Sequence, residues 1–298
     1  MKNKETIFSK KTNFHWVLMI ILIFAGACQT SDSKDENRTL RIVYTDWSES
    51  VAITHLTAVL LEEKMEYKVI LKLTDVESAY DEVAQEKTDV FLDAWLPETH
   101  KRYYDKHAET VELVGITYPE ARTGLLVPDY SKFTTIADLK SYSNPIIGID
   151  PGAGVMMQTQ RAIEEYGLEI SLKNLSEQEM LKHLVDSVKR RKEVVVTGWE
   201  PHWIFARYNI RFLEDPDDVF GHQEKIYTIA NKNIEQKHPQ AVRFFERMQL
   251  TENQLNELIY HVRLSEDPRA GVKEWIDQNE YIVNQWVKDL KPKRKKIM

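Results

Sequence analysis

The sequence predicts an α/β protein of two lobes. Apolar runs rich in β-branched residues alternate with stretches of helical period from residue 40 to residue 231, a pattern typical of strand–helix units with mostly parallel sheets. About 260 residues follow the N-terminal segment, which is more than one hydrophobic core usually holds. From residue 235 onward the chain has helical period only.

The individual strands and helices can be assigned in order from these periods. Strands are predicted at residues 40–45, 68–73, 89–94, 123–128, 146–150, 194–198 and 225–231. Helices are predicted at residues 50–65, 76–86, 98–107, 155–166, 177–191, 238–249, 251–264 and 268–288. The stretch 251-TENQ-254 predicts a capping box at the start of its helix.

Two segments, 121–128 and 224–232, are predicted to cross between the lobes. If both are extended, they lie antiparallel and form a two-strand hinge. Lobe I then holds residues 40–121 and 228–298, and lobe II holds residues 122–227. A discontinuous lobe joined to its neighbour by two strands implies a ligand cleft that opens and closes.

The N-terminal segment is predicted to be a targeting signal. Four lysines and one glutamate in residues 1–15 precede the apolar run 16-WVLMIILIFAG-26, which is shorter than the roughly 20 residues of a membrane-spanning helix. Residues 1–27 are therefore interpreted as a signal peptide. The segment 25-AGAC-28 resembles a lipobox, which makes Cys28 the lipidated first residue of a lipoprotein held at the outer face of the cytoplasmic membrane. An uncleaved anchor and a buried structural cysteine are the alternatives. Residues 28–39 predict a polar, flexible tether.

The composition argues against several classes of partner and activity. Removal of residues 1–27 changes the formal net charge from −7 to −10, and an acidic surface disfavours nucleic acid. The basic end 291-KPKRKK-296 is interpreted as a solvated tail, with contact to an anionic membrane as the alternative. The sequence has no phosphate-binding glycine motif, metal-ligand spacing or nucleophile motif. We expect no cofactor, no metal and no enzymatic activity.

Three tryptophans come at the ends of predicted strands, in 40-LRIVYTDWSES-50, 89-DVFLDAWLPETH-100 and 194-VVVTGWEPHW-203. Ligands of open α/β sheets bind beyond the carboxyl ends of the strands, so Trp47, Trp95 and Trp199 are predicted to meet in the cleft. Core or rim packing is the alternative for each of them. Three indole faces suit a cation without hydrogen-bond donors, above all a quaternary ammonium group.

The stretch 146-IIGIDPGAGVM-156 predicts an anion site. A strand ends near Asp150, a turn follows, and a helix begins near Gly154, so the backbone N–H groups of Gly154 and Val155 are expected to bind a carboxylate. His100 is a candidate for a further hydrogen bond to that carboxylate. The alternatives are a turn without a ligand and a capping or surface histidine. A cationic head and a carboxylate in one small ligand describe a betaine.

These motifs resemble those of the substrate-binding lipoproteins of bacterial glycine betaine and proline betaine ABC importers. The similarity is carried by 89-DVFLDAWLPETHKRYY-104, 146-IIGIDPGAGVM-156 and 194-VVVTGWEPHWIFARYNIRFLEDP-216, with a weaker match at 42-IVYTDWSESVA-52. It spans nearly all of residues 40–290.

The resemblance implies a type II periplasmic-binding-protein fold with the ligand cleft between two lobes. It assigns the aromatic cage to Trp47, Trp95 and Trp199, and the carboxylate site to the amides of Gly154 and Val155 with the side chain of His100. It also implies a receptor that delivers a betaine to an ABC permease and its ATPase for osmoprotection. We expect this receptor to be a monomer.

Two other functions stay open at this point. A choline or carnitine receptor uses a similar cage, although choline has no carboxylate for the helix-start amides. A carbohydrate-active enzyme stacks sugars on tryptophans, with Glu98 or Glu200 paired with Asp93 as acid and base. Solvated rim charges are the alternative for those two glutamates.

Overall fold

The computed structural model describes residues 38–290, and its residues from Leu40 onward form one compact unit. The predicted signal peptide, Cys28, nearly all of the predicted tether and the basic tail lie outside the described residues. Within residues 38–290, no helix combines the length and apolar character needed to cross a membrane.

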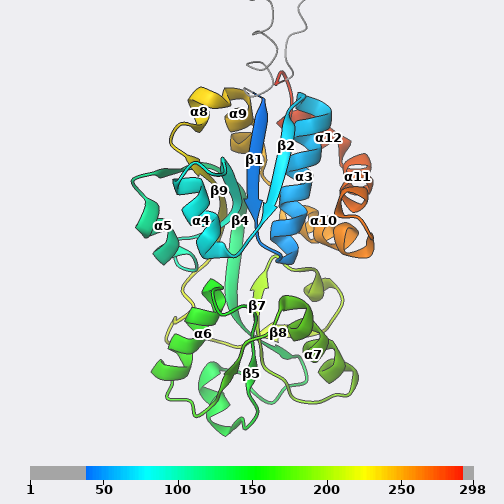
Figure 1. Cartoon of the computed structure of the whole chain (residues 1–298). Coiled ribbons are helices and arrows are strands. Elements are labelled where there is room, and N and C mark those ends of the chain that lie inside the picture. The colour runs from blue at the N-terminus through cyan, green and yellow to red at the C-terminus, as the bar shows by residue number, and fades with distance from the viewer. Residues whose placement is uncertain (1–37, 291–298) are drawn as a thin grey trace, which may run out of the picture. The chain divides into compact units, whose positions relative to one another are not determined.

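The elements divide between two lobes (Figure 1). Lobe I is built from β1 (Thr39–Tyr44), α3 (Ser48–Met65), β2 (Lys68–Leu73), α4 (Val76–Ala84), β3 (Val90–Leu96), α5 (Lys101–His107), the first part of β4 (Val111–Pro128), β9 (Glu224–Asn231), α8 (Ile234–Lys237), α9 (Pro239–Arg247), α10 (Glu252–Leu264), α11 (Pro268–Gln278) and α12 (Glu280–Trp286). Lobe II is built from the rest of β4, η1 (Ile136–Ser141), β5 (Ile146–Ile147), α6 (Gly154–Glu165), β6 (Leu172–Lys173), α7 (Glu177–Lys189), β7 (Val196–Glu200), η2 (Trp203–Ala206) and β8 (Ile210–Phe212).

A mixed sheet runs through both lobes in the order β2-β1-β3-β9-β4-β7-β5-β6, with β8 paired to β4. The pairs β1–β3, β5–β6 and β5–β7 are parallel, as the strand–helix alternation predicts. The pairs that β4 and β9 make are antiparallel. The sheet is therefore mixed rather than mostly parallel, because the two connecting strands run against their neighbours.

The chain crosses between the lobes in extended, antiparallel segments. The part of β4 from Val111 to Ala121 pairs with β9 in lobe I, and the part from Arg122 to Leu126 pairs with β7 in lobe II. Figure 1 shows β4 passing continuously from one lobe to the other. The lobe boundaries drawn from the sequence, at 121/122 and 227/228, stay a prediction.

Local signals fix the ends of the helices. Thr251 and Gln254 form the expected capping box at α10. The single helix expected at 268–288 is instead two helices, α11 and α12, which meet at Asn279. There the Asn279 side-chain amide donates to the carbonyl oxygen of Trp275 at 2.9 Å, a local side-chain bond that competes with regular helix geometry.

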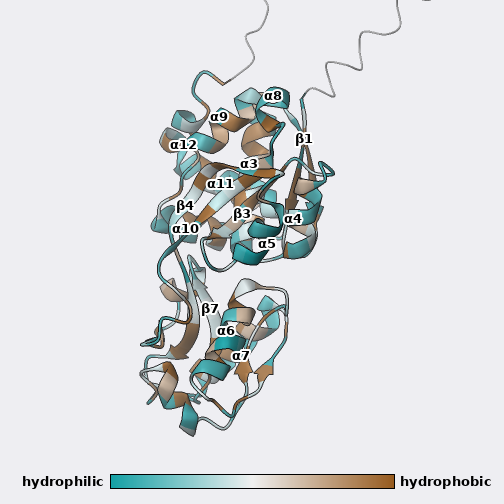
Figure 2. Cartoon of the chain, turned by 90° about the vertical axis from the view of Figure 1, so that its left-hand side faces the viewer, coloured by the Kyte–Doolittle hydropathy of each residue, from teal (hydrophilic) through white to brown (hydrophobic). Residues whose placement is uncertain are grey.

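The core of each lobe lies between the sheet and its helices. Figure 2 shows apolar residues on the strands and on the sides of the helices that face them, with hydrophilic residues outward. Helix α3 packs between β3 on one side and α10 and α11 on another, which explains why residues all around it are buried. This packing fixes the N-terminus of α3, where Trp47 and Glu49 lie.

Candidate ligand-binding site

A small cavity lies where the strand ends of the two lobes meet. Its free volume is about 20 Å³ in this closed arrangement, so a small ligand is favoured. The cavity is lined by Trp47, Glu49, Trp95, Thr99, His100, Thr123, Ile149, Ala153, Gly154, Val155 and Trp199. The structure thus brings all six residues predicted for the cage and the carboxylate site to one cavity. Their roles in binding stay predictions.

The three tryptophans reach the cavity from equivalent places in the fold. Trp47 is the N-cap residue of α3, shortly after β1 ends, while Trp95 and Trp199 are the penultimate residues of β3 and β7. All three side chains are buried. The prediction that strand ends would gather these rings agrees with where the structure places them.

Each of these indole N–H groups donates to a carboxylate. The Nε1 of Trp47 donates to Asp150 Oδ2 at 3.2 Å, and the Nε1 of Trp95 donates to Asp93 Oδ1 at 2.8 Å. The Nε1 of Trp199 donates to Glu49 Oε2 at 2.9 Å. Because every ring N–H already has an acceptor, the rings offer a ligand their carbon surfaces, which attract cations through the ring quadrupole.

Several hydrogen bonds join the lobes around the cavity. Two of the indole bonds, from Trp47 to Asp150 and from Trp199 to Glu49, connect lobe I with lobe II. The Ser48 backbone N–H also donates to Glu177 Oε2 at 2.9 Å, at the start of α3. The Tyr103 hydroxyl donates to the carbonyl oxygen of Gly152 at 2.6 Å. The structure is therefore a closed arrangement of the lobes.

Other residues that line the cavity present hydrogen-bond donors. Helix α6 begins at Gly154, and its N-cap residue Ala153 makes no side-chain cap. The amides of Gly154 and Val155 have no hydrogen-bond acceptor among residues 38–290, as expected for the first turn of a helix. Two free amides together with the positive end of the helix dipole suit a carboxylate.

His100 is held as a neutral hydrogen-bond donor. It occupies the N-cap position of α5 without capping it, and it is buried rather than on the surface. Its Nδ1 accepts the backbone N–H of Trp95 at 3.1 Å, so Nε2 carries the proton and is the nitrogen available to a ligand. Burial lowers the pKa of His100 to about 3, which keeps the ring uncharged near neutral pH.

Glu49 and Asp93 are buried acids. The sequence analysis named Asp93 only as an acid–base candidate and did not name Glu49. Burial, then the negative charges of Asp93 and Glu177, raise the pKa of Glu49 well above its usual value. Burial likewise raises the pKa of Asp93 to about 7, against hydrogen bonds from Trp95 and Ser50. The pattern W-x-E after a strand was the available signal for Glu49, but nothing local reveals that its partner is Trp199.

The acid–base arrangement considered for an enzyme does not assemble in the cavity. Glu98 is exposed, and Glu200 forms an ion pair with Arg122 at 2.7 Å. Neither glutamate lines the cavity. Among residues 38–290, no group of three or more histidine, cysteine or acidic residues is placed to hold a metal ion.

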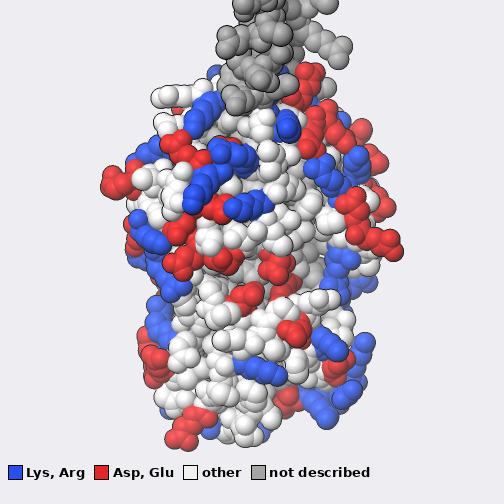
Figure 3. Space-filling model, viewed as in Figure 1, with Lys and Arg blue, Asp and Glu red and all other residues white. Residues whose placement is uncertain are grey.

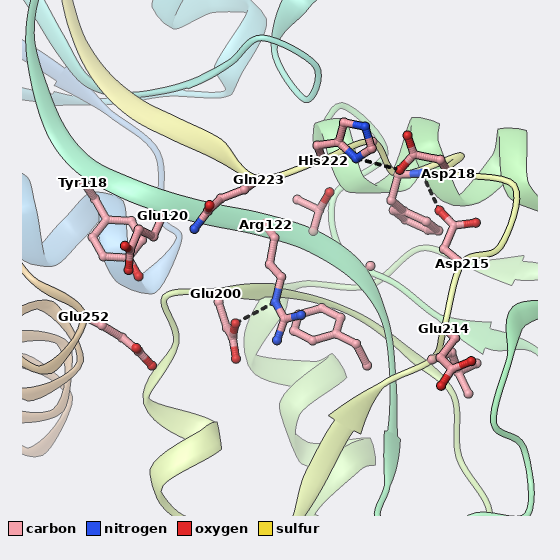
Figure 4. A pocket seen from close by; sticks show the side chains of 16 residues that line it. Tyr118, Glu120, Arg122, Glu200, Glu214, Asp215, Asp218, His222, Gln223 and Glu252 are labelled. Carbon is pink, nitrogen blue, oxygen red and sulfur yellow. Dashed lines mark hydrogen bonds and ion pairs between the residues drawn. The ribbon is translucent and has the colours of Figure 1, made fainter.

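A larger groove of about 670 Å³ lies beside the crossing strands and contains none of the predicted cage residues. Figure 4 shows Arg122 directed at Glu200, with acidic side chains around them. The guanidinium of Arg122 also lies over the Phe212 ring, 4.2 Å from its centroid. The charged lining and the internal ion pair of this groove are those of a solvated surface rather than of a small-molecule pocket.

Acidic side chains are exposed along the junction of the lobes on the face seen in Figure 3. A groove at the junction is lined in part by three acids, Asp46, Glu177 and Glu179, and by three cations, Lys182, Lys189 and Arg263.

Comparisons with known proteins agree with this geometry. Residues 38–278 match the family model described as OpuAC, substrate binding domain of ABC-type glycine betaine transport system. The chain is 32% identical over 180 residues to the glycine betaine/carnitine transport binding protein GbuC of Listeria monocytogenes serotype 1/2a (strain 10403S). That alignment covers 59% of this chain and 59% of GbuC, so the match spans about three-fifths of the relative.

Two solved structures extend the similarity over most of the chain. Lactococcal OpuAC, in a closed-liganded conformation complexed with glycine betaine, has a TM-score of 0.81 and 30% identity, with 84% of this chain and 100% of that chain covered. The glycine/betaine/L-proline-binding protein ProX of Borrelia burgdorferi has a TM-score of 0.80 and 29% identity, with 84% and 97% covered. The expected two-lobe α/β fold of the periplasmic-binding-protein type is confirmed.

Proposed function

Because the chain belongs to the family of substrate-binding domains of ABC-type glycine betaine transport systems, we propose that it is an extracytoplasmic receptor for glycine betaine or proline betaine. The receptor captures the betaine and delivers it to an ABC permease and its ATPase for osmoprotection. It acts as a non-enzymatic monomer, anchored at the outer face of the cytoplasmic membrane through a lipid on Cys28.

The observation that carries the proposal is the pairing of two unlike ends in one small cavity. One end has three indole rings, from Trp47, Trp95 and Trp199, and the other has the free amides of Gly154 and Val155. A trimethylammonium group has no donors and meets the rings, while a carboxylate meets the amides and the Nε2–H of His100. Betaines carry both groups a short distance apart.

Each end takes residues from both lobes, because Trp199 of lobe II joins Trp47 and Trp95 of lobe I, and His100 of lobe I joins the α6 amides of lobe II. Binding is therefore coupled to closure. Each favourable indole face contributes about 0.5–2 kcal/mol to the free energy of binding, and association costs several kcal/mol. Neither lobe alone therefore holds the ligand tightly. The ligand bridges the lobes and shifts the equilibrium toward the closed arrangement by its higher affinity for that arrangement.

Calorimetric titration with glycine betaine, proline betaine, carnitine and choline tests the ligand assignment. We expect the two betaines to bind more tightly than choline, because choline leaves the amides of Gly154 and Val155 without an anion. Carnitine is included because GbuC, a relative of this chain, is named for it. Choline binding above betaine would overturn the assignment, and so would the absence of both heat and fluorescence change with millimolar betaine.

The anchoring is tested separately from binding. We expect Cys28→Ser to release the full-length protein from the membrane fraction of cells while the secreted protein still binds betaine. A Cys28→Ser protein that stays in the membrane fraction would contradict lipidation at this position.

A further inference from the structure

Two buried acidic side chains, one lining the cavity and one hydrogen-bonded to a tryptophan that lines it, have no cation to neutralise them. Glu49, on α3, is 1% exposed and lines the cavity, and Asp93, on β3, is 0% exposed. Among residues 38–290, the main influences on the pKa values of the two carboxyl groups are burial, hydrogen bonds and neighbouring acids, with no lysine or arginine among them. Unpaired buried charges are costly, and proteins avoid them by pairing or by protonation.

The groups around Glu49 are neutral or acidic. Its Oε2 accepts the indole N–H of Trp199, from β7. The charges that act on it are those of Asp93, from β3, and Glu177, from α7. Glu177 is itself engaged with the Ser48 N–H and with His202 Nε2, which lies 3.1 Å from its Oε1.

The groups around Asp93 follow the same pattern. Its Oδ1 accepts the indole N–H of Trp95, and its Oδ2 has no hydrogen-bond partner among the described residues. The Ser50 hydroxyl on α3 lowers its pKa, and the charge of Glu177 raises it. The phenol of Tyr80, from α4, is buried and neutral. His100, on the same cavity, is also neutral.

Two interacting acids in such a place titrate as one unit. When a pair of carboxyl groups shares a buried site without a counter-ion, the first ionises and the second holds its proton to a higher pH. In the ligand-free protein near neutral pH, the pair therefore retains at least one proton. A permanent cation placed among Trp47, Trp95 and Trp199 supplies the missing positive charge beside Glu49.

We propose that Glu49 and Asp93 together form the counter-charge of the ligand cation, and that entry of a quaternary ammonium group releases a proton from this pair. The O–H bond of one carboxylic acid breaks, its proton passes to water or buffer, and the resulting carboxylate stabilises the ammonium group. No bond to the ligand forms. The inference rests on the proposed function, since it names how the same site selects a positive charge.

Proton release makes betaine affinity depend on pH with a fixed sign. A ligand that favours the deprotonated pair binds more tightly as pH rises. Each unit of pH between about 6 and 8 strengthens binding by a factor that approaches tenfold when one full proton is released. The dependence levels off at higher pH, where the ligand-free pair is already ionised.

Calorimetry in two buffers measures the proton directly. Betaine is titrated into the wild-type protein at pH 7 in phosphate and in Tris, which differ widely in ionisation enthalpy. We expect the observed enthalpies to differ by an amount that corresponds to a substantial fraction of one proton released per betaine. Glu49→Gln and Asp93→Asn should each remove most of this buffer dependence, and Glu109→Gln, an exposed glutamate-to-glutamine control, should retain it.

An uncharged analogue tests the same idea without a proton measurement. In 3,3-dimethylbutanoate, carbon replaces the ammonium nitrogen of glycine betaine, so size and carboxylate are kept and the cation is lost. We expect Glu49→Gln to weaken betaine binding about tenfold or more while it changes binding of the analogue less than threefold.

The outcomes separate this inference from the proposed function. Wild-type protein that binds betaine with equal enthalpies in both buffers would overturn proton release and leave the receptor function standing. Equal losses of betaine and analogue binding in Glu49→Gln would overturn the counter-charge, since the variant would then act only on cavity shape. No betaine binding by the wild type, in either buffer or by fluorescence, would overturn the function itself.

Discussion

The backbones of Gly154 in lobe II and Thr99 in lobe I are in close contact across the junction of the lobes. A Cβ atom built on Gly154, at the start of α6 in lobe II, would lie 2.2 Å from the carbonyl oxygen of Thr99, in the turn after β3 in lobe I. Glycine is the residue that permits so close an approach. The contact exists only while the lobes are closed. Glycine at position 154 is therefore required for closure and not for the folding of either lobe.

Gly154→Ala is therefore expected to weaken betaine binding without unfolding the protein. Overpacking a close contact costs about 1–3 kcal/mol, which corresponds to about 5- to 150-fold in Kd. Gly152→Ala is the matched control, because a Cβ there would meet only the Tyr103 hydroxyl, at 3.8 Å. Calorimetry gives the two affinities, and thermal unfolding of the ligand-free proteins should give similar Tm values. Equal affinities for both variants would contradict the closure argument.

The cage predicts that tryptophans differ in their effect on binding. Trp95→Ala removes a cation-binding face, and we expect it to weaken betaine binding far more than Trp275→Ala does. Trp275 is fully buried and stacks on Trp286 in lobe I, with ring centroids 6.4 Å apart. Its loss should instead lower Tm, since truncating a buried tryptophan costs about 3–5 kcal/mol of stability. Affinity loss of similar size in both variants would argue against the cage.

His100 is predicted to donate a hydrogen bond to the ligand carboxylate. We expect His100→Ala to weaken betaine binding about tenfold, as for a lost hydrogen bond to a charged group, and to leave the weaker binding of choline nearly unchanged. Competition between the two ligands in wild type and variant measures the difference. An equal loss for both ligands would assign His100 a structural role only.

The same histidine should affect acid stability. Its pKa is lowered to about 3 in the folded protein by burial, while the unfolded chain takes up a proton below about pH 6.5. The folded state is therefore disfavoured progressively as pH falls from about 6.5 toward 3, by about 2–3 kcal/mol at pH 4.5. We expect His100→Gln to lose less stability than wild type over this range in denaturant titrations. Parallel pH profiles would show that His100 is protonated in the folded protein.

A pair of cation–π contacts joins the lobes at a distance from the ligand. The guanidinium of Arg263, on α10, lies 3.9 Å from the centroid of the Trp203 ring in η2, and that of Arg207 lies 4.2 Å from the centroid of Tyr260. Each contact contributes about 0.5–1 kcal/mol at an exposed site. We expect Arg263→Ala to weaken betaine binding about twofold to fivefold, and Arg243→Ala, which removes an exposed arginine from α9, to have no effect. An unchanged Kd in Arg263→Ala would exclude a contribution of this contact to closure.

Local patterns predicted most of the fold, because the apolar period of a strand or helix is visible within a short stretch of sequence. The first part of β4 was missed, since Glu112, Pro119 and Glu120 interrupt its apolar period. The short strands β6 and β8, of 2 and 3 residues, carry too few positions for a period. The contact of Trp203 with Arg263 of lobe I also has no local signal in the sequence.

The candidate site likewise contains residues that the sequence predicted and residues that it did not. Trp47, Trp95, Trp199 and the start of α6 were predicted because each is marked by its own strand end or turn. The carboxylates were not, since the bond from Trp199 to Glu49 joins residues 150 positions apart. Only the tertiary structure shows that Glu49, which lies near Trp47 in the sequence, accepts the indole N–H of Trp199.

A crystal structure with glycine betaine tests the central claim most directly. The account predicts the trimethylammonium group within about 6 Å of the ring centroids of Trp47, Trp95 and Trp199. It also places the carboxylate within hydrogen-bond distance of the Gly154 and Val155 amides. Betaine bound outside this cavity, or with its carboxylate among the indole rings, would contradict it.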